Sequence, residues 1–274
     1  MIEILKSVIL GIIQGITEWL PISSTGHMIL FNDIWPMELS EEFVNLFLVV
    51  IQFGSILAVI VMYFSKLWPF SSKKSAEERK ATWTLWLKIL IGVIPAGVLG
   101  LLFDDWIDEH LYGSTVVAVM LIVYGVFFLI AEDRKRDPKV KTLDQLSWKH
   151  ALLIGFFQAL ALIPGTSRSG ATILGGIWTG CARTVAAEFS FFLAIPTMFG
   201  ASGLKLAKYF LRSGFGFSGI ETAVLATGMV VTFVVSLIAI RFLMSYIRKH
   251  DFKVFGWYRI VLGIAVLAYF LFLK

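Results

Sequence analysis

Two apolar segments of the chain are interrupted near their centres by proline, glycine and hydroxyl residues, and the two interruptions are similar to one another. The first segment reads GIIQGITEWLPISSTGHMIL (residues 11–30), and the second reads GFFQALALIPGTSRSGATIL (residues 155–174). Because proline, glycine and hydroxyl residues occur together in the middle of each segment, we expect that neither forms one continuous helix. Aligned without a gap, the segments are identical at Gly11/Gly155, Gln14/Gln158, Ser23/Ser167, Gly26/Gly170, Ile29/Ile173 and Leu30/Leu174.

Composition indicates a membrane protein. Of the 274 residues, 58% are hydrophobic and only 16% are charged, which is typical of a polytopic membrane chain and not of a soluble domain. The net charge of +5 does not indicate nucleic-acid binding, because the basic residues lie in short connections beside apolar stretches. With Cys181 as the only cysteine, an internal disulfide is excluded.

Several stretches are apolar and long enough to cross a bilayer, which needs about 20 helical residues. The segments at about 7–30 and 150–180 differ, since each is broken in the middle. We expect each of them to form a re-entrant helical hairpin that returns to the side it came from. The sequence therefore predicts an all-α polytopic membrane protein with two re-entrant hairpins and six transmembrane helices, at residues 43–64, 84–103, 115–131, 187–208, 220–243 and 254–273.

The distribution of charge between the spans predicts their orientation. The connection after the second span carries four acidic residues, Asp104, Asp105, Asp108 and Glu109, and no Lys or Arg. Because Lys and Arg are enriched on the cytoplasmic side, we expect the basic connections in the cytoplasm and the acidic one outside. The basic connections contain Lys66, Lys73, Lys74, Arg79 and Lys80; then Arg134, Lys135, Arg136, Lys139, Lys141 and Lys149; and finally Arg248, Lys249 and Lys253.

The two interrupted segments indicate an internal duplication within a single membrane domain, residues 1–274. Its halves would be about 1–145 and 146–274, each with one hairpin and three spans. An odd number of crossings inverts the second half, so the two hairpin tips can meet near the middle of the membrane. Chance similarity between two apolar segments is the alternative. A second similarity between the halves favours duplication. Glu42-Phe43 and Phe53-Gly54 have the same spacing as Glu188-Phe189 and Phe199-Gly200.

The first interruption carries residues suited to chemistry on an anion. Gln14 and Glu18 lie four residues apart, on one helical face, and Pro21 then ends that helix. The run from Ser23 to His27 offers hydroxyls and free backbone N–H groups at a helix start, which favour an anion. His27 is near enough in sequence to accept a serine proton, and Glu18 could orient it or bind a cation. The simpler alternative is that the serines only cap a helix and that His27 is merely hydrogen-bonded.

The second interruption places Arg168 between serines and glycines. A charged residue near the bilayer centre costs about 2.5–3.5 kcal/mol to insert, which favours a functional role. Its planar guanidinium suits a phosphate group. The alternative is a structural ion pair with Glu18 or Glu188. Two other arginines, Arg241 and Arg259, lie near span ends, where we expect their side chains to extend to the interface.

Together the two tips would supply a hydroxyl, a base, a carboxylate and a guanidinium in one buried pocket. That set suits phosphoryl transfer, which depends on neutralising phosphate charge and aligning the attacking group.

Four sequence signatures resemble those of the bacterial undecaprenyl-diphosphatases of the bacitracin-resistance family. They are QGITEWLPISSTGH (residues 14–27), VIQFGSIL (50–57), PGTSRSGAT (164–172) and AEFSFFLAIP (187–196). The resemblance covers nearly the whole chain. It implies a multi-pass enzyme of the bacterial cytoplasmic membrane that removes one phosphate from undecaprenyl diphosphate. Such an enzyme regenerates the lipid carrier for peptidoglycan and other envelope glycans, and confers bacitracin resistance when abundant.

The same resemblance implies roles for individual residues. By position, Ser24 becomes the nucleophile, His27 the base or alternative nucleophile, Glu18 the metal-binding or orienting carboxylate, and Arg168 the diphosphate anchor. A divalent cation, Mg²⁺ or Ca²⁺, would bind at Glu18 and Gln14, although many family members have glutamate where this chain has Gln14. The active site would face the periplasmic side. The residues expected to bind substrate around this centre are Ser23, Thr25, Gly26, Ser167, Ser169, Gly170 and Thr172.

Two other functions compete with the phosphatase. A transporter or flippase for a polyprenyl phosphate would need the arginine but not a serine–histidine pair. A lipid-phosphate phosphatase that uses two histidines is disfavoured, because the chain has only four histidines and three lie far from any arginine-rich signature. The sequence leaves open the oligomeric state, a homodimer included, and the choice between a phosphoserine intermediate and direct attack by water. The lipid diphosphate and membrane lipid are the expected partners.

Overall fold

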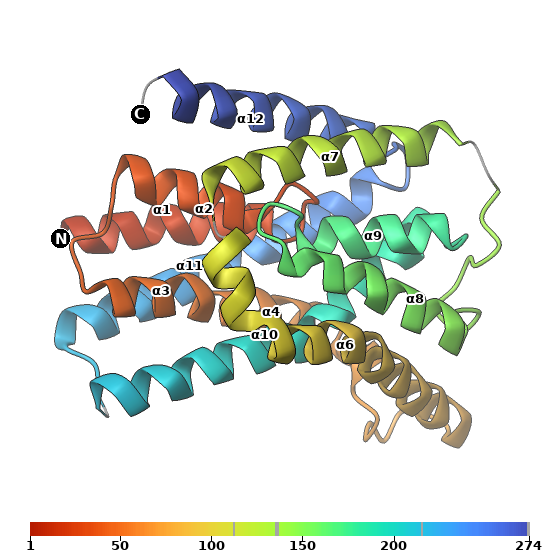
Figure 1. Cartoon of the computed structure of the whole chain (residues 1–274). Helices are drawn as coiled ribbons and strands as arrows, with labels where there is room; N and C mark the ends of the chain where they lie inside the picture. The colour runs from red at the N-terminus through yellow and green to blue at the C-terminus, as the bar shows by residue number, and fades with distance from the viewer. Residues whose placement is uncertain (112, 135–136, 215, 273–274) are drawn as a thin grey trace.

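The computed structural model describes residues 1–111, 113–134, 137–214 and 216–272, apart from the side chains of Asp104, Asp105, Asp108 and Ser213. In this part of the chain all regular structure is helical, except for one isolated bridge between Val140 and Cys181. The helices are α1 (Ile2–Thr17), α2 (Ser24–Ile34), α3 (Glu41–Val50), α4 (Gln52–Met62), α5 (Phe64–Leu67), α6 (Ala76–Leu111), α7 (Ser114–Asp133), α8 (Trp148–Ala159), the 3₁₀ turn η1 (Leu160–Leu162), α9 (Arg168–Trp178), α10 (Arg183–Ser213), α11 (Gly219–Tyr246) and α12 (Lys253–Phe272) (Figure 1).

Six helical stretches are long and apolar enough to cross a membrane, and each coincides with an expected span. They cover Glu41–Met62, Ala76–Phe103, Ser114–Asp133, Arg183–Arg212, Gly219–Tyr246 and Lys253–Phe272. The chain is therefore an all-helical, multi-pass membrane protein.

One expected connection is wrong in its secondary structure. The acidic stretch from Asp104 to Glu109 was expected to be a loop, but α6 continues through it to Leu111. No glycine or proline occurs between Leu101 and Leu111, so nothing stops the helix before Gly113. The side chains of Asp104, Asp105 and Asp108 lie outside the described residues, as do Lys135 and Arg136 of the basic connection.

The two interrupted segments are broken at matching positions. α1 ends at Thr17 and α2 begins at Ser24, while α8 and η1 end at Leu162 and α9 begins at Arg168. The residues preceding α2 and α9 are Ser23 and Ser167, which share a position in the alignment. Both have positive φ, 76° and 71°, which is rare outside glycine. Each serine hydroxyl accepts a bond from the glycine N–H three residues later, so the two turns have the same local geometry.

Close helix packing depends on glycines that let backbones approach one another. Gly11 and Gly15 of α1 face α11, and Gly155 of α8 faces Gly92 of α6. Gly125 of α7 similarly faces α12, and these two helices run side by side in Figure 1. In a membrane, where association between apolar helices relies on van der Waals contact, small residues at such crossings are the common solution.

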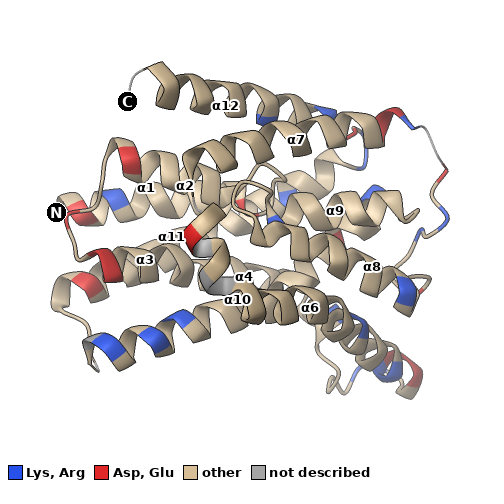
Figure 2. Cartoon of the chain, viewed as in Figure 1, with Lys and Arg blue, Asp and Glu red and all other residues tan. Residues whose placement is uncertain are grey.

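Most Lys and Arg residues gather at one end of the molecule, where α4 connects to α6, α7 to α8, and α11 to α12 (Figure 2). At this end the buried carboxylate of Glu132 accepts bonds from Arg183, with Nε to Oε1 at 2.9 Å, and from the backbone N–H of Phe252. Arg183 thus ties the start of α10 to the end of α7, and Glu132 in turn joins α7 to the residue that precedes α12.

The Gly92–Gly155 contact predicts a sharp sensitivity to substitution. A Cβ at Gly155 would lie 2.3 Å from the carbonyl oxygen of Gly92, so Gly155→Val must separate α8 from α6. We expect the free energy of unfolding to fall by about 1–3 kcal/mol, as measured by thermal unfolding of the purified protein. The matched control is Gly200→Val, since a Cβ at Gly200 would meet nothing within 4 Å. Equal stability of the two variants would contradict this packing.

Candidate active site

The two helix breaks meet at the carboxylate of Glu18, which directly follows α1. Its Oε1 accepts a bond from Arg168 Nη2 at 2.7 Å. Its Oε2 accepts bonds from Ser24 Oγ at 2.7 Å and from Gln14 Nε2 at 3.1 Å. The hydroxyl of Ser169 also donates to the backbone carbonyl of Glu18 at 2.8 Å. One buried carboxylate therefore joins hydroxyl, amide and guanidinium groups from both interrupted segments.

Arg168 is held by α10 as well as by Glu18. Its Nη1 donates to the backbone carbonyl of Ser190 at 2.9 Å, and its guanidinium lies 5.5 Å from the ring of Trp19. Thr172 supports this arrangement, because its hydroxyl lies 2.6 Å from that of Ser190. The Nε of Arg168, however, is buried without a hydrogen-bond partner among the described residues. The position of the guanidinium is fixed, and one of its donors is still available.

Arg259 of α12 holds the two turns themselves. It is completely buried, and its guanidinium donates to the carbonyl oxygens of Pro21 at 3.1 Å, Gly165 at 2.9 Å and Thr166 at 2.8 Å. The expectation that this side chain extends to the interface is therefore wrong. Carbonyls freed by a helix break in a membrane need a donor, and Arg259 supplies one to each turn.

A cavity of about 190 Å³ lies between the two turns. Its polar lining groups come from both of them and from the neighbouring helices. Gln158, the counterpart of Gln14 in the alignment, lines it with its amide buried and unpaired among the described residues. Burying polar groups without partners costs free energy, so these groups indicate a polar ligand. The lining residues include Glu18, Ser23, Ser24, Thr25, Gln52, Gln158, Ser167, Arg168 and Thr197.

His27 lies apart from this cluster. Its Nδ1–H donates to the backbone carbonyl of Ser23 at 2.7 Å, so the neutral ring accepts at Nε2 from the hydroxyl of Tyr258, also at 2.7 Å. The two rings are stacked, with centroids 5.7 Å apart. His27 does not line the cavity, and the hydroxyl of Ser24 bonds to Glu18 instead. The expected serine–histidine contact is therefore absent from this arrangement, and the simpler alternative of a hydrogen-bonded histidine describes it.

The remaining sequence candidates fall into two groups. The first group, Ser23, Thr25 and Ser167, lines the cavity. The second group supports the turns without lining the cavity: the N–H groups of Gly26 and Gly170 bond to the capping serines, and Ser169 and Thr172 make the contacts given above. Gly170 also leaves room for Arg259, since a Cβ there would lie 2.9 Å from its Nη1.

Oxygen ligands for a cation are few. No group of three or more His, Cys, Asp or Glu side chains that could hold a metal ion occurs within the described residues. The candidates at the site are the Glu18 carboxylate and the Oε1 of Gln14, which is buried and unpaired in this part of the chain. Mg²⁺ is often bound by one or two protein oxygens together with substrate phosphates, so this pair is compatible with a substrate-bridged ion.

Among the residues of the site, Gln158, Ser190 and Arg259 were not expected there from the sequence. Gln158 could have been found, because it pairs with Gln14 in the alignment of the two segments. Ser190 and Arg259 carried no such signal. Their roles come from helices α10 and α12 packing against α9 and α7, and no local pattern reports that packing.

The fold and the site define a class: an all-helical, multi-pass membrane protein with a buried hydroxyl, carboxylate and guanidinium, the set used in phosphoryl-transfer chemistry. The family model for bacitracin resistance protein BacA matches residues 7–265, and the chain belongs to that family.

Relatives of the chain match it over nearly its whole length. An undecaprenyl-diphosphatase 1 from Clostridioides difficile (strain 630) is 61% identical, over 98% of this chain and 97% of the relative. An undecaprenyl-diphosphatase from Acetivibrio thermocellus is 56% identical over 99% of each chain, and one from Enterococcus faecalis is 56% identical over 97% of each.

The position of Arg259 predicts that the site depends on it. Arg259→Gln removes the guanidinium that donates to the carbonyls of Pro21, Gly165 and Thr166. Each carbonyl left without a donor should lower the free energy of unfolding by about 1–3 kcal/mol. We expect a markedly lower thermal unfolding temperature for the purified protein. Arg241→Gln is the control, because Arg241 is exposed on α11. If both variants unfold at the wild-type temperature, Arg259 does not hold the turns.

Proposed function

We propose that this protein hydrolyses undecaprenyl diphosphate to undecaprenyl phosphate and inorganic phosphate. It thereby recycles the lipid carrier for peptidoglycan and other envelope glycans and confers bacitracin resistance. The relatives, which are named undecaprenyl-diphosphatases, support this assignment, as does membership of the family. The observation that carries it is the shared Glu18 carboxylate, which bonds to a serine hydroxyl and to an arginine that retains a free donor.

We infer that α1–α2 and α8–α9 are re-entrant hairpins of two inverted repeats, about 1–145 and 146–274, within one domain. Figure 1 supports this. The start of α1 and the end of α2 lie at one end of the molecule, and the start of α8 and the end of α9 lie at the opposite end. Packing is also reciprocal: α1 packs against α11, and its counterpart α8 packs against α6, the counterpart of α11.

The same arrangement supports an orientation in the bacterial cytoplasmic membrane. The basic end of the molecule in Figure 2 faces the cytoplasm by the positive-inside rule. The α1–α2 hairpin then enters from the periplasmic side, and a diphosphate reaches the cavity from there. Its polyprenyl tail stays among the lipids along the exposed apolar faces of the spans.

Binding of the diphosphate depends on Arg168. The unpaired Nε donates to a phosphate oxygen, while the contacts of Arg168 with Ser190 and Glu18 keep the guanidinium in place. The amide of Gln158 supplies a further donor. Such preorganised donors stabilise the charge that develops on the transferred phosphoryl group.

Ser24 then attacks the terminal phosphorus. Its Oγ–P bond forms as the bond from phosphorus to the bridging oxygen breaks, and undecaprenyl phosphate leaves. Glu18 Oε2, 2.7 Å from Oγ, receives the serine proton. Water then hydrolyses the phosphoserine. His27 positions the Ser23–Ser24 turn through its bond to the Ser23 carbonyl. A phosphorylated Ser24 peptide after acid quenching distinguishes this route from direct attack by water.

A divalent cation, Mg²⁺ or Ca²⁺, would be held by Glu18 and the Oε1 of Gln14, and would supply further charge neutralisation at the diphosphate. Compared with a site that has two carboxylates, this pair provides one negative charge fewer. A requirement for a higher cation concentration follows from that difference.

Substitutions of the hydroxyl and the carboxylate test the assignment. We expect Ser24→Ala and Glu18→Gln to lower phosphate release from undecaprenyl diphosphate by about 10³-fold or more, because nucleophile and base act as a unit. Arg168→Ala removes a donor that stabilises phosphate charge, and it should lower phosphate release by about 10²–10³-fold. His27 only positions the Ser23–Ser24 turn, so His27→Asn should lower phosphate release less than Ser24→Ala does.

The matched control is Ser202→Ala, which removes a buried serine hydroxyl that donates to the Val49 carbonyl and does not line the cavity. It should retain near wild-type phosphate release. A wild-type protein that binds the lipid diphosphate yet releases no phosphate would refute the enzyme and favour a transporter or flippase for a polyprenyl phosphate.

The cation proposal has its own test. Chelation should abolish phosphate release, and Mg²⁺ should restore it. Gln14→Glu should lower the Mg²⁺ concentration for half-maximal activity by about 10-fold, since affinity rises with ligand charge. The thermal stabilisation of the substrate-free protein by Mg²⁺ should shift in parallel. Gln145→Glu, on the exposed α7–α8 connection, is the control. Unchanged cation dependence in Gln14→Glu would exclude Gln14 as a ligand.

A further inference from the structure

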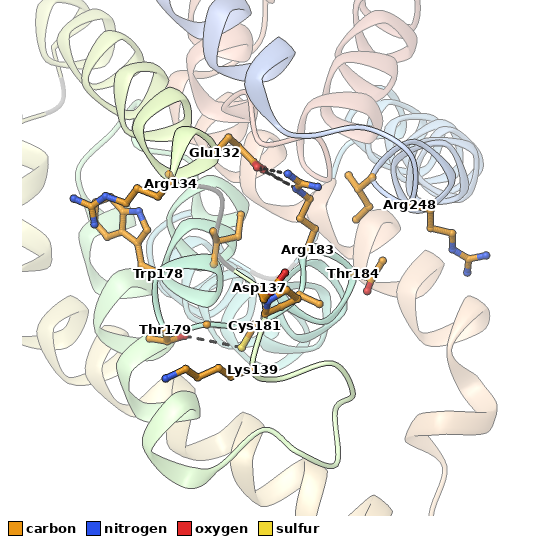
Figure 3. A pocket seen from close by; sticks show the side chains of 16 residues that line it. Glu132, Arg134, Asp137, Lys139, Trp178, Thr179, Cys181, Arg183, Thr184 and Arg248 are labelled. Carbon is orange, nitrogen blue, oxygen red and sulfur yellow. Dashed lines mark hydrogen bonds and ion pairs between the residues drawn. The ribbon is translucent and has the colours of Figure 1, made fainter.

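A second cavity, of about 600 Å³, lies at the basic end of the molecule, and none of its lining residues belongs to the candidate active site (Figure 3). It is bordered by the end of α7, the connection that follows, the turn between α9 and α10, and the end of α11. Its volume exceeds that of the active-site cavity, so it can accept an anionic group together with the atoms attached to it.

The cavity carries an excess of positive charge that is not neutralised internally. Arg183 is paired with Glu132. Three further lining cations, Arg134, Lys139 and Arg248, have no side-chain hydrogen bond or ion pair among the described residues. Asp137 is the one lining carboxylate left without such a partner in that part of the chain. The unpaired groups therefore sum to +2, which matches a phosphate dianion.

Figure 3 shows how these groups are arranged. Arg134 and Lys139 lie on one side of the cavity and Arg248 on the other, with Arg183 and Asp137 between them. The lining cations therefore border the cavity on two sides, from the residue that follows α7, the connection to α8 and the residues that follow α11.

Backbone donors converge on the same cavity. α10 begins here after Ala182, which has no side chain able to cap it, whereas α2, α3, α8, α9 and α11 are each capped by a serine. The N–H groups of Arg183 and Thr184 in its first turn are therefore free for an anion. The indole N–H of Trp178, a lining residue, is also buried and unpaired within the described residues.

We propose that this cavity is a second anion site, which binds a phosphate group carried either by a lipid headgroup or by free inorganic phosphate. The cavity is lined by cations from the connections that follow α7 and α11, by the uncapped start of a 31-residue helix and by a residue with an unpaired indole N–H. The site lies beside the ends of membrane spans, where headgroup phosphates are found. It is independent of the proposed catalytic reaction.

The test compares phosphate binding by purified full-length protein with and without these cations. The variant Arg134→Gln/Lys139→Gln/Arg248→Gln removes three exposed positive charges that line the cavity. Its matched control, Lys73→Gln/Arg79→Gln/Lys149→Gln, removes three exposed charges from the same end that do not line it. Thermal unfolding is followed in titrations with inorganic phosphate and, separately, with soluble dihexanoyl phosphatidic acid, against dihexanoyl phosphatidylcholine at equal ionic strength.

We expect one or both phosphate compounds to stabilise the wild type and the control variant, with an apparent Kd at least about 10-fold weaker in the cavity variant. Stabilisation by phosphatidic acid alone identifies a lipid headgroup, and stabilisation by inorganic phosphate identifies the free ion. The effect should persist in Arg168→Ala, which separates this cavity from the active site. Equal stabilisation of the cavity and control variants, or none in the wild type, would overturn the proposal.

Discussion

The structure depends on satisfying the backbone groups that two helix breaks expose inside an apolar protein. In hydrocarbon, a carbonyl without a donor costs several kcal/mol, so broken helices survive only where protein supplies partners. Here one guanidinium, that of Arg259, bonds to Pro21 in the first turn and to Gly165 and Thr166 in the second. Because a single rigid fork binds both turns, it also fixes the distance between them. The breaks therefore come together as a consequence of being stabilised.

The helix breaks also position the side chains that are proposed to act on the substrate. The interior of an unbroken helix has no free N–H groups to offer a ligand, because each is bonded to a carbonyl of the same helix. A break places Glu18 just after one helix and Arg168 at the first position of another, where the two can meet at 2.7 Å. Removing one partner from a buried pair leaves an uncompensated charge, which is strongly destabilising. Ser24 shares that carboxylate, so the groups that stabilise the tips are also the groups proposed to act on the substrate.

The spans and the helix breaks were predictable from the sequence. The roles of Arg259 and His27 were not, for a physical reason. Apolar length located the six spans, and proline with glycine located both breaks, because these signals are local. Arg259 was misjudged because its partners lie 93 to 238 residues away, and position along a span says nothing about which way a side chain packs. His27 was assigned to Ser24 by sequence proximity, yet its ring nitrogen contacts Tyr258, 231 residues away. The roles of both residues depend on where α12 packs.

The duplication that we propose would account for a site built from two similar segments. Ser24 and Arg168 occupy the same position in the alignment, one residue after the positive-φ serine, and both bond to Glu18. The counterpart of Glu18 is Leu162. A second carboxylate there would place two negative charges near one another in a buried pocket, and like charges at such a depth cannot both be compensated by one arginine. The differences at these two positions make the two similar helix caps complementary halves of a single anion site: the first supplies a hydroxyl and a carboxylate, and the second supplies the cation.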